Sequence, residues 1–312
     1  MQMEHYDKRP TAIQRQTKHP LDIFSYLSIS YHEWPHVTHV KLNRPNKRNA
    51  INSLMWREIG EAFRQIGTRG DGTRCVLLSG SGKGFCGGID VTDNKFFAGI
   101  SPDSQKDDES TSIDIARKVL AFKPQISQMQ EAFTAVEECP VPVVTAIHGA
   151  CIGAGVDLAC CTDVRVCSQD AVFSIREARL GLAADVGTLQ RFPKLVGFGS
   201  LVRELCYTGA DFSSEDALKI GFVSRISYSS NQLFEDVNKI ITKIIANSPV
   251  AVTVTKSALN YSRDHTIREG LDHVAILNSS ALMSDDLVKS FMKSSEAGEV
   301  AQFAPLRPHS RL

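Results

Sequence analysis

The stretch that decides the fold runs from Cys139 to Val166 and reads CPVPVVTAIHGACIGAGVDLACCTDVRV. It contains a continuous apolar run, Pro142–Ile147, which is typical of a strand buried on both faces of a sheet. A glycine-bearing loop follows at Gly149–Gly155, and helical spacing begins near Val156. This strand–loop–helix junction predicts an α/β fold and directs backbone N–H groups toward whatever the loop binds.

The same pattern occurs earlier in the chain. His36–Asn43 alternates polar and apolar residues like a strand, and Leu54–Ile66 has the apolar spacing of a helix. Cys75–Ser79 is a second continuous apolar run, and it leads into another glycine-bearing loop, Gly80–Asp90 (GSGKGFCGGID). We therefore expect two buried neighbouring strands that each end in a glycine loop.

The remaining segments complete the predicted organisation. Asp93–Pro124 begins polar and irregular, which predicts an inserted loop over one end of the fold, and a helix is expected over Ser127–Glu138. Ser213–Gly221 has the capping residues of a short helix. After residue 230 strand patterns largely stop, and successive helices are expected over Asn231–Ala246, Pro249–Ser262, Thr266–Met283 and Asp285–Lys293. The predicted domains are a disordered tail (1–30), a core with the active site (31–230) and a helical C-terminal domain (231–312).

Composition excludes several classes of protein. The 35 basic and 35 acidic residues give zero net charge, which argues against a large nucleic-acid surface. No apolar run approaches the roughly 20 residues that span a bilayer. The eight cysteines lie in apolar stretches without an upstream secretory segment, so we expect reduced, buried thiols in an intracellular compartment.

The glycine loops do not carry a nucleotide motif. The glycines at 149, 153 and 155 do not fit G-x-G-x-x-G, and no G-K-[ST] follows for a phosphate loop. The physical alternative is an oxyanion pocket, in which one N–H from each of the two loops donates to a single carbonyl oxygen.

Three acids follow the second loop. Asp157 lies at the start of the helix after it, Glu177 follows a strand-like stretch, and Asp185 is flanked by apolar residues. Together they fit paired general acid–base work, in which burial separates the pKa values of neighbouring carboxyl groups. The structural alternative is that Asp185 or Asp157 is a helix N-cap.

Other chemistries find less support. His148 and the cysteines that follow it match no zinc spacing, so no metal is expected. Ser79–Gly82 reads SGSG rather than G-x-S-x-G, which argues against a hydrolase nucleophile.

Several segments together resemble the enoyl-CoA hydratase/isomerase (crotonase) superfamily over roughly residues 35–295. They are NRPNKRNAINSLMW from Asn43, GKGFCGGIDV, the stretch from Cys139 to Val166, and FPKLVGFGSLVRELCYTGADFSSEDALKIGFVSRI. Within that superfamily, IHGACIGAGVDL and REARLGLAADVGTLQRFPK resemble the isomerases that convert 3,5-dienoyl-CoA to 2,4-dienoyl-CoA in β-oxidation. A hydratase would carry Glu at Asp157 and a glycine near Asp185.

The resemblance implies roles for individual residues. The backbone N–H groups of Ile89 and Ala154 would form the oxyanion hole, with Ala154 standing where glycine is usual. Glu177 and Asp185 would shuttle a proton between carbons 2 and 6 of the acyl chain, and which of the two removes it stays open. Asp157 would orient or tune Glu177.

Binding and assembly are also implied by the resemblance. The substrate and coenzyme A contacts would come from Lys47, Arg48, Ala50, Gly88, Asp90 and Gly153, with the two basic residues serving the phosphates. Coenzyme A is part of the substrate, and no metal or redox cofactor is implied. The fold would be a spiral of ββα turns with a C-terminal helical domain that forms a homotrimer or homohexamer, and the 94–124 loop would help close the acyl pocket.

The last three residues, Ser310, Arg311 and Leu312, resemble the S-K-L address of peroxisomal proteins. We therefore expect an import receptor as a partner and a peroxisome or related organelle as the location. An arbitrary tail, and a mitochondrial location directed by the N-terminus, are the alternatives.

Two kinds of rival function remain. A hydratase or a Δ3,Δ2-enoyl-CoA isomerase would share the fold. A non-catalytic crotonase-like protein that binds RNA or other proteins is of a different class, and neutral charge and the retained acids count against it.

Overall fold

The computed structural model describes residues 24–31, 34–68, 70–93, 114–197, 199–294 and 302–306. Most of the predicted N-terminal tail, the greater part of the predicted covering loop and the tripeptide Ser310–Leu312 lie outside these residues. Within them, no helix is both long and apolar enough to cross a membrane.

A six-stranded sheet forms the centre of the fold, in the order β1-β2-β3-β4-β6-β9. β1 is antiparallel to β2, and every other neighbouring pair is parallel. The strands are β1 (Leu27–Tyr31), β2 (Val37–Leu42), β3 (Cys75–Gly80), β4 (Val143–Ile147), β6 (Val164–Ser168) and β9 (Arg225–Ser227). The three strands expected from the sequence in this sheet, at β2, β3 and β4, are confirmed.

Apolar side chains cover both faces of this sheet. Cys75 and Leu77 of β3 pack with the cluster around α8 (Ser230–Ile245), whereas Val76 and Leu78 pack into the larger core on the opposite face. Adjacent side chains alternate between faces, so a strand covered on both sides needs a continuous apolar run. The runs in β3 and β4 satisfy this requirement.

The larger core is enclosed by the remaining elements of residues 34–230. A small second sheet has the order β5-β7-β8, with strands β5 (Ala150–Ile152), β7 (Val172–Ser174) and β8 (Asp211–Ser213). The helices are α1 (Ser53–Thr68), α3 (Ile115–Glu137), α4 (Ala154–Cys160), α5 (Thr188–Leu195), α6 (Gly199–Thr208) and α7 (Ser214–Lys219), with short 3-10 turns η2 (Pro45–Lys47) and η4 (Glu177–Leu180). The predicted capping box of α7 is confirmed, because Ser213 and Asp216 bond each other's backbone N–H.

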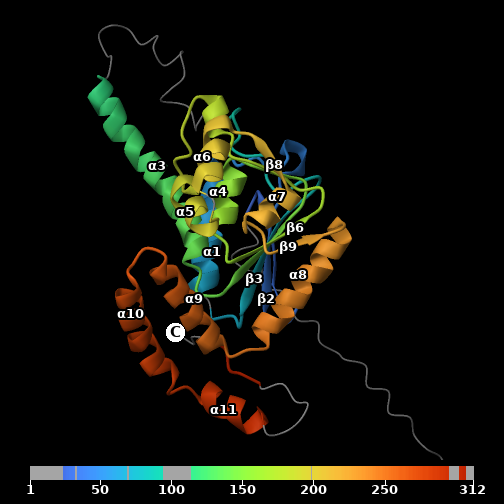
Figure 1. The fold of residues 1–312 in the computed structure, drawn as a ribbon, viewed down its shortest axis with the longest axis vertical. Helices are drawn as coiled ribbons and strands as arrows, with labels where there is room; N and C mark the ends of the chain where they lie inside the picture. Colours follow the sequence, from blue (N-terminus) through green and yellow to red (C-terminus); the bar gives the residue numbers. More distant parts are fainter. Residues whose placement is uncertain are drawn as a thin grey trace, which may run out of the picture.

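The C-terminal helices follow the predicted order: α8, α9 (Pro249–Ser262), α10 (Ile267–Ala281) and α11 (Asp285–Ser294). α8 contacts β3, β4, β6 and β9, so it is part of the packed core. Figure 1 shows α9, α10 and α11 at the end of the molecule away from α6. α10 packs mainly on α9.

α3 departs from the sequence-based expectation. The helix begins at Ile115 rather than at Ser127, and Pro124 lies inside it. Its start is fixed by Asp114, whose side chain accepts a hydrogen bond from the Arg117 N–H at 3.0 Å. Ile115, Val119 and Phe122 recur at helical spacing, but Pro124 inside the segment led the sequence prediction to start the helix after it.

Candidate active site

The two glycine loops run side by side. The Phe85 N–H donates to the His148 carbonyl at 2.8 Å, and the Cys86 N–H donates to the Ala150 carbonyl at 2.9 Å. A Cβ on Gly149, which has φ of +54°, would lie 2.3 Å from the Lys83 carbonyl oxygen. Only glycine allows this approach, which brings the backbones of the two loops together.

The two predicted oxyanion donors lie beside this junction. Ile51 pairs with the backbone on both sides of Ile89, through the Gly88 carbonyl and the Asp90 N–H. The Ile89 N–H therefore points away from Ile51. Ala154 is the first residue of α4, where an N–H has no partner within the helix. Within the described residues, neither N–H donates to a backbone carbonyl.

Ala154 takes the place of glycine without strain. It is absent from the described residues with positive φ, and the unusual backbone angles fall on Gly153 instead, with φ of +50° and ψ of −117°. A Cβ on Gly153 would lie 3.1 Å from Oε1 of Glu177. The glycine thus lets the loop turn into α4 directly against a carboxyl group.

The predicted catalytic acids and oxyanion donors line the same pocket. Its volume is about 380 Å³, and Asp157, Glu177 and Asp185 all line it together with Ile89 and Ala154. Gly88 and Gly153 also contribute to the lining. The apolar wall consists of Trp56, Val91, Phe122, Ile126, Met129, Ile152, Leu180, Leu182 and Val186. The site therefore offers polar groups at one part of an apolar cavity, as acyl-chain chemistry requires.

Asp157 is the most deeply placed acid. It lies in α4 with no exposed surface, and Oδ1 accepts the Thr188 N–H at 2.6 Å. Its second oxygen, Oδ2, is buried without a hydrogen-bond partner among the described residues. Burial, together with the nearby Glu177 carboxyl, raises the pKa of Asp157 to about 7.

Glu177 and Asp185 complete the set. Glu177 begins η4 and is half-buried, and burial raises the pKa of its carboxyl, with Asp185 adding to the effect. Asp185 lies at the exposed rim, where partial shielding from water raises its pKa. Asp185 is not an N-cap, because α5 begins after Gly187.

No basic side chain neutralises these acids. Within the described part of the chain, none of the three forms an ion pair. Arg176 and Arg179 reach the pocket lining, but Arg176 pairs with Asp211 at 2.8 Å and Arg179 donates to the Thr208 carbonyl at 3.0 Å. Without a nearby cation to stabilise the ionised form, these acids have raised pKa values, which suits them to proton transfer.

The other predicted binding residues lie outside the pocket lining. Lys47 and Arg48 are exposed at the end of η2, and the Arg48 carbonyl accepts the Gly87 N–H at 2.8 Å. Asp90 is buried against Arg44, at 2.9 Å, and hydrogen bonds from Thr92 and then Arg44 lower its pKa to about 2. The Ala50 carbonyl accepts from the same arginine. Asp90 and Ala50 thus bind Arg44 and stabilise the conformation of the first glycine loop, Gly80–Asp90.

Sequence reasoning missed the residues that position the acids. Thr188 supplies the one N–H that Asp157 accepts, and Gln130 of α3 donates to the Asp185 carbonyl at 2.6 Å. Both partners are far from the acids in sequence, so no local motif marks them. The apolar wall from α3 was missed because its helix was expected to begin later.

The cysteines do not join the site. All eight are free, and all but Cys206 are buried. Burial raises the pKa of the Cys86 thiol to about 12, which keeps it neutral. Among the described residues, no group of three or more His, Cys, Asp or Glu side chains is placed to hold a metal ion.

Comparisons with known proteins identify the family. Residues 35–300 match the family model described as Enoyl-CoA hydratase/isomerase. The human mitochondrial Delta(3,5)-Delta(2,4)-dienoyl-CoA isomerase is 45% identical over 265 residues, covering 85% of this chain and 78% of that protein. The peroxisomal protein of the same name from Arabidopsis thaliana is 42% identical over 251 residues, covering 80% and 87%. An enoyl-CoA hydratase structure from Bacillus anthracis superposes with a TM-score of 0.77 at 26% identity, covering 89% of this chain and 99% of that one.

Proposed function

The chain belongs to the enoyl-CoA hydratase/isomerase family, and from this we propose that it converts 3,5-dienoyl-CoA to 2,4-dienoyl-CoA in fatty-acid β-oxidation. The observation that carries the proposal is one pocket lined by two backbone donors and by three acids that form no ion pair with any residue the structure describes. Relatives in human and in Arabidopsis thaliana bear the name of this activity.

The reaction moves one proton and leaves atoms and charge balanced. The thioester carbonyl accepts hydrogen bonds from the Ile89 and Ala154 N–H groups, which stabilise the negative charge that develops on its oxygen. One carboxylate removes a proton from carbon 2, and the electrons spread through the two double bonds to carbon 6. A second carboxyl group, in its acid form, donates a proton to carbon 6.

Glu177 and Asp185 are the proposed proton-transfer pair, with either one as the base. The reaction needs one of them ionised and the other protonated, and the raised pKa values of both carboxyl groups favour the protonated form that donates. After each turnover the two groups have exchanged protonation states. Asp185, at the exposed rim, is placed to re-equilibrate with water.

Asp157 is proposed to tune Glu177 rather than to transfer protons. It is wholly buried and already accepts the Thr188 N–H. Its charge state acts on Glu177 through the low-dielectric interior, since like charges at close range oppose ionisation.

Substrate binding follows from the same geometry. Lys47 and Arg48 are exposed next to the glycine loop, where they are proposed to meet the phosphates of coenzyme A. No metal or redox cofactor is proposed, because the thioester carbonyl and the diene on either side of carbon 2 both delocalise the anion and so make the carbon 2 proton acidic. Coenzyme A enters as part of the substrate.

The assembly and location are also proposals. α10 and α11 expose large apolar side chains, including Ile267, Leu271, Ile276, Phe291 and Met292, which suits a homotrimer or homohexamer. The boundary of this C-terminal domain at residue 231 stays a prediction. Ser310–Leu312 suggests peroxisomal import through a receptor, while the mitochondrial name of the human relative supports the alternative.

The direct experiment follows the absorbance of the product, a diene conjugated with the thioester carbonyl, when purified protein is mixed with 3,5-dienoyl-CoA. Formation of 2,4-dienoyl-CoA well above background supports the proposal. Background conversion of the dienoyl substrate combined with rapid hydration of 2-enoyl-CoA would instead assign the chain to the hydratases.

A further inference from the structure

Asp157 receives its hydrogen bond from the start of α5. The N-cap of that helix is Gly187, which has no side chain to accept an orphan N–H. Asp157, from α4, accepts another orphan N–H of the same turn, that of Thr188, at 2.6 Å. The position of α5 therefore determines whether the carboxylate of Asp157 is stabilised by this N–H and by the positive end of the helix.

α5 is held in place by Arg191, one turn after Thr188. Its Nε donates to Oε2 of Glu137 at 2.8 Å, and Nη2 donates to the Thr134 hydroxyl at 3.0 Å. Both partners belong to α3. The guanidinium also lies against the backbone of Gly187, because a Cβ there would be 2.1 Å from Nη1. Arg191 thus fixes the first turn of α5 against α3.

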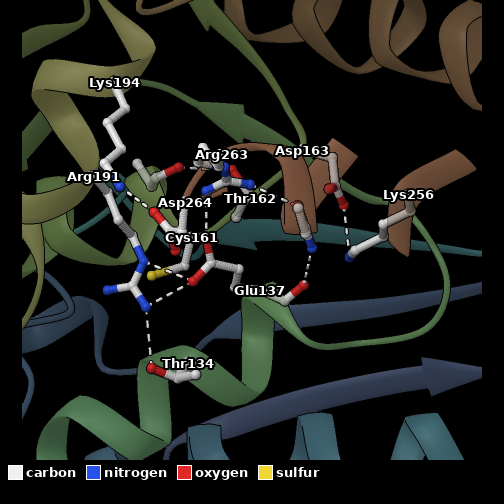
Figure 2. Close-up of polar contacts among 12 residues, drawn as sticks. Thr134, Glu137, Cys161, Thr162, Asp163, Arg191, Lys194, Lys256, Arg263 and Asp264 are labelled. Atoms are coloured by element: carbon white, nitrogen blue, oxygen red, sulfur yellow. Dashed lines mark hydrogen bonds and ion pairs between the residues drawn. The ribbon is translucent and has the colours of Figure 1, made fainter. Parts of the chain in front are cut away.

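The second oxygen of Glu137 reaches the C-terminal helices. Oε1 accepts from Nη1 of Arg263, the residue that ends α9, and Asn260 donates to the Glu137 backbone carbonyl at 3.0 Å. Figure 2 shows the Glu137 carboxylate between the two arginines, with Thr134 on the same helix. One carboxylate therefore joins α3, α5 and the end of α9.

The same face of α3 also holds the loop that carries Asp185. Gln130, Thr134 and Glu137 are spaced four and three residues apart, so they share one face of the helix. Gln130 donates to the Asp185 carbonyl, and the other two hold Arg191. α3 consequently sets the positions of Asp185 and of the N–H that Asp157 accepts.

We infer that Glu137 is a positioning residue of the active site: it holds Arg191 so that the Thr188 N–H stays on Asp157, and it links that contact to α9 through Arg263. The catalytic consequence rests on the proposed isomerase function, whereas the geometric one does not. Glu137 is itself outside the lining of the acid pocket.

Loss of the contact between Glu137 and Arg191 is expected to change the pKa of Asp157. If α5 moves away, Asp157 loses the hydrogen bond that favours its ionised form, so its pKa rises further. The other titratable groups facing Asp157 are Glu177 and Asp185 across the pocket and the surrounding thiols of Cys86, Cys151, Cys160, Cys161 and Cys206. Burial keeps the pKa of those thiols high and the thiols neutral, so the two pocket acids are the groups that respond.

The test compares Glu137→Gln with the matched control Asp163→Asn. Asp163 also anchors α9 to the core, through Lys256 at 2.8 Å, but makes no contact with α5 among the described residues (Figure 2). Three quantities are measured for each variant: kcat and KM across pH, the thermal midpoint, and hydrogen–deuterium exchange of the peptide covering residues 184–192.

We expect Glu137→Gln to lower kcat by about 10- to 100-fold with KM within about twofold of wild type, as small displacements of catalytic groups do. The pH profile of kcat should shift toward lower pH, because an Asp157 that stays protonated opposes the ionisation of Glu177 and Asp185 less, and exchange at Thr188 should accelerate. Asp163→Asn should lower the thermal midpoint while leaving the pH profile and the Thr188 exchange as in wild type.

The inference is overturned if Glu137→Gln lowers only the thermal midpoint, as the control does. Should Glu137→Gln fail to fold, Arg191→Lys replaces it, because lysine keeps the charge but not the contacts to both Glu137 and Thr134. Wild-type exchange at Thr188 in that variant also overturns the inference. If wild-type protein does not isomerise dienoyl-CoA, the proposed function fails, and the exchange data still decide the role of Glu137.

Discussion

Acidic side chains lie in two different settings in this molecule. One is the acid pocket, and the other is the ion-pair cluster beside α9, formed by Glu137, Asp163, Arg191, Lys256 and Arg263. In the pocket, Asp157, Glu177 and Asp185 have no ion-pair partner among the described residues. In the ion-pair cluster, Glu137 and Asp163 are each paired, with Arg191 at 2.7 Å and with Lys256 at 2.8 Å. Cations are therefore placed where acids hold helices together and withheld where acids are to exchange protons.

The largest difference is expected when a pocket acid is neutralised. Glu177→Gln and Asp185→Asn should each lower kcat by about 10²- to 10⁴-fold, the usual contribution of a general acid or base. Stability should be unchanged or slightly higher, because each variant removes an ionisable group with no counter-ion. Diene absorbance and thermal melting measure the two effects. Full activity in both variants would end the acid–base assignment.

Breaking a pair in the cluster should have the opposite outcome. Lys256→Met leaves the partly exposed Asp163 without its cation, so the stability loss should lie below the about 3–5 kcal/mol that breaking a fully buried pair costs. Turnover at a temperature where the variant is folded should stay within about twofold of wild type. Urea unfolding and steady-state kinetics test this, and a loss of turnover matching that of the pocket variants would contradict the contrast.

Gly153→Ala is expected to lower both the stability and the kcat of the protein. A backbone at φ of +50° and ψ of −117° strains any residue with a Cβ, at about 1–3 kcal/mol. The new methyl would also press on Oε1 of Glu177 and lower kcat by about tenfold or more. Gly221→Ala is a suitable control, because it has positive φ but no atom near the added Cβ. Similar kinetics for the two variants would show that strain alone is responsible.

The unpaired state of Asp157 predicts a pH-dependent stability cost. The pKa of Asp157 is about 7 in the folded protein and ordinary when unfolded, so between about pH 4 and pH 7 the folded state binds more protons. The free energy of unfolding therefore falls as pH rises through this window, by at most about 1.4 kcal/mol per pH unit from this group. Asp157→Asn should remove that decline. Parallel pH dependences for the two proteins in urea unfolding would contradict the assigned shift.

The smallest effect is expected at an exposed pair. Lys194 of α5 contacts Asp264, but both side chains are largely exposed, at 45% and 64%. Lys194→Gln should cost under about 1 kcal/mol and leave kcat and its pH profile unchanged. A shift in the pH profile would mean that any ion pair made by α5 affects the acids, and that the effect is not specific to the contact between Arg191 and Glu137.

Sequence patterns were sufficient where the structure depends on local chemistry. Apolar runs located β3 and β4 because both faces of those strands are covered, and the capping residues of Ser213–Gly221 marked α7. The resemblance of the sequence motifs to the crotonase superfamily grouped Asp157, Glu177 and Asp185, and the three line one pocket. The roles of these residues stay proposals until they are tested.

Sequence patterns failed where contacts are long-range or exposed. The Asp157–Thr188 and Glu137–Arg191 contacts join residues from separate elements, and neither has a local signature. The start of α3 was misplaced because Pro124 suggested a break. Lys47 and Arg48 illustrate a further limit, because exposed basic residues look alike whether or not they bind phosphate.

The central claim is that one acid of the pocket removes a proton from carbon 2 while a second acid delivers its own proton to carbon 6. It is tested most directly by incubating wild-type protein with 3,5-dienoyl-CoA in D₂O and locating deuterium in the product by mass spectrometry and NMR. We predict 2,4-dienoyl-CoA with deuterium at carbon 6, delivered by a carboxyl group that has exchanged with solvent. A hydroxyacyl-CoA formed by addition of water, or unreacted substrate, would contradict the account.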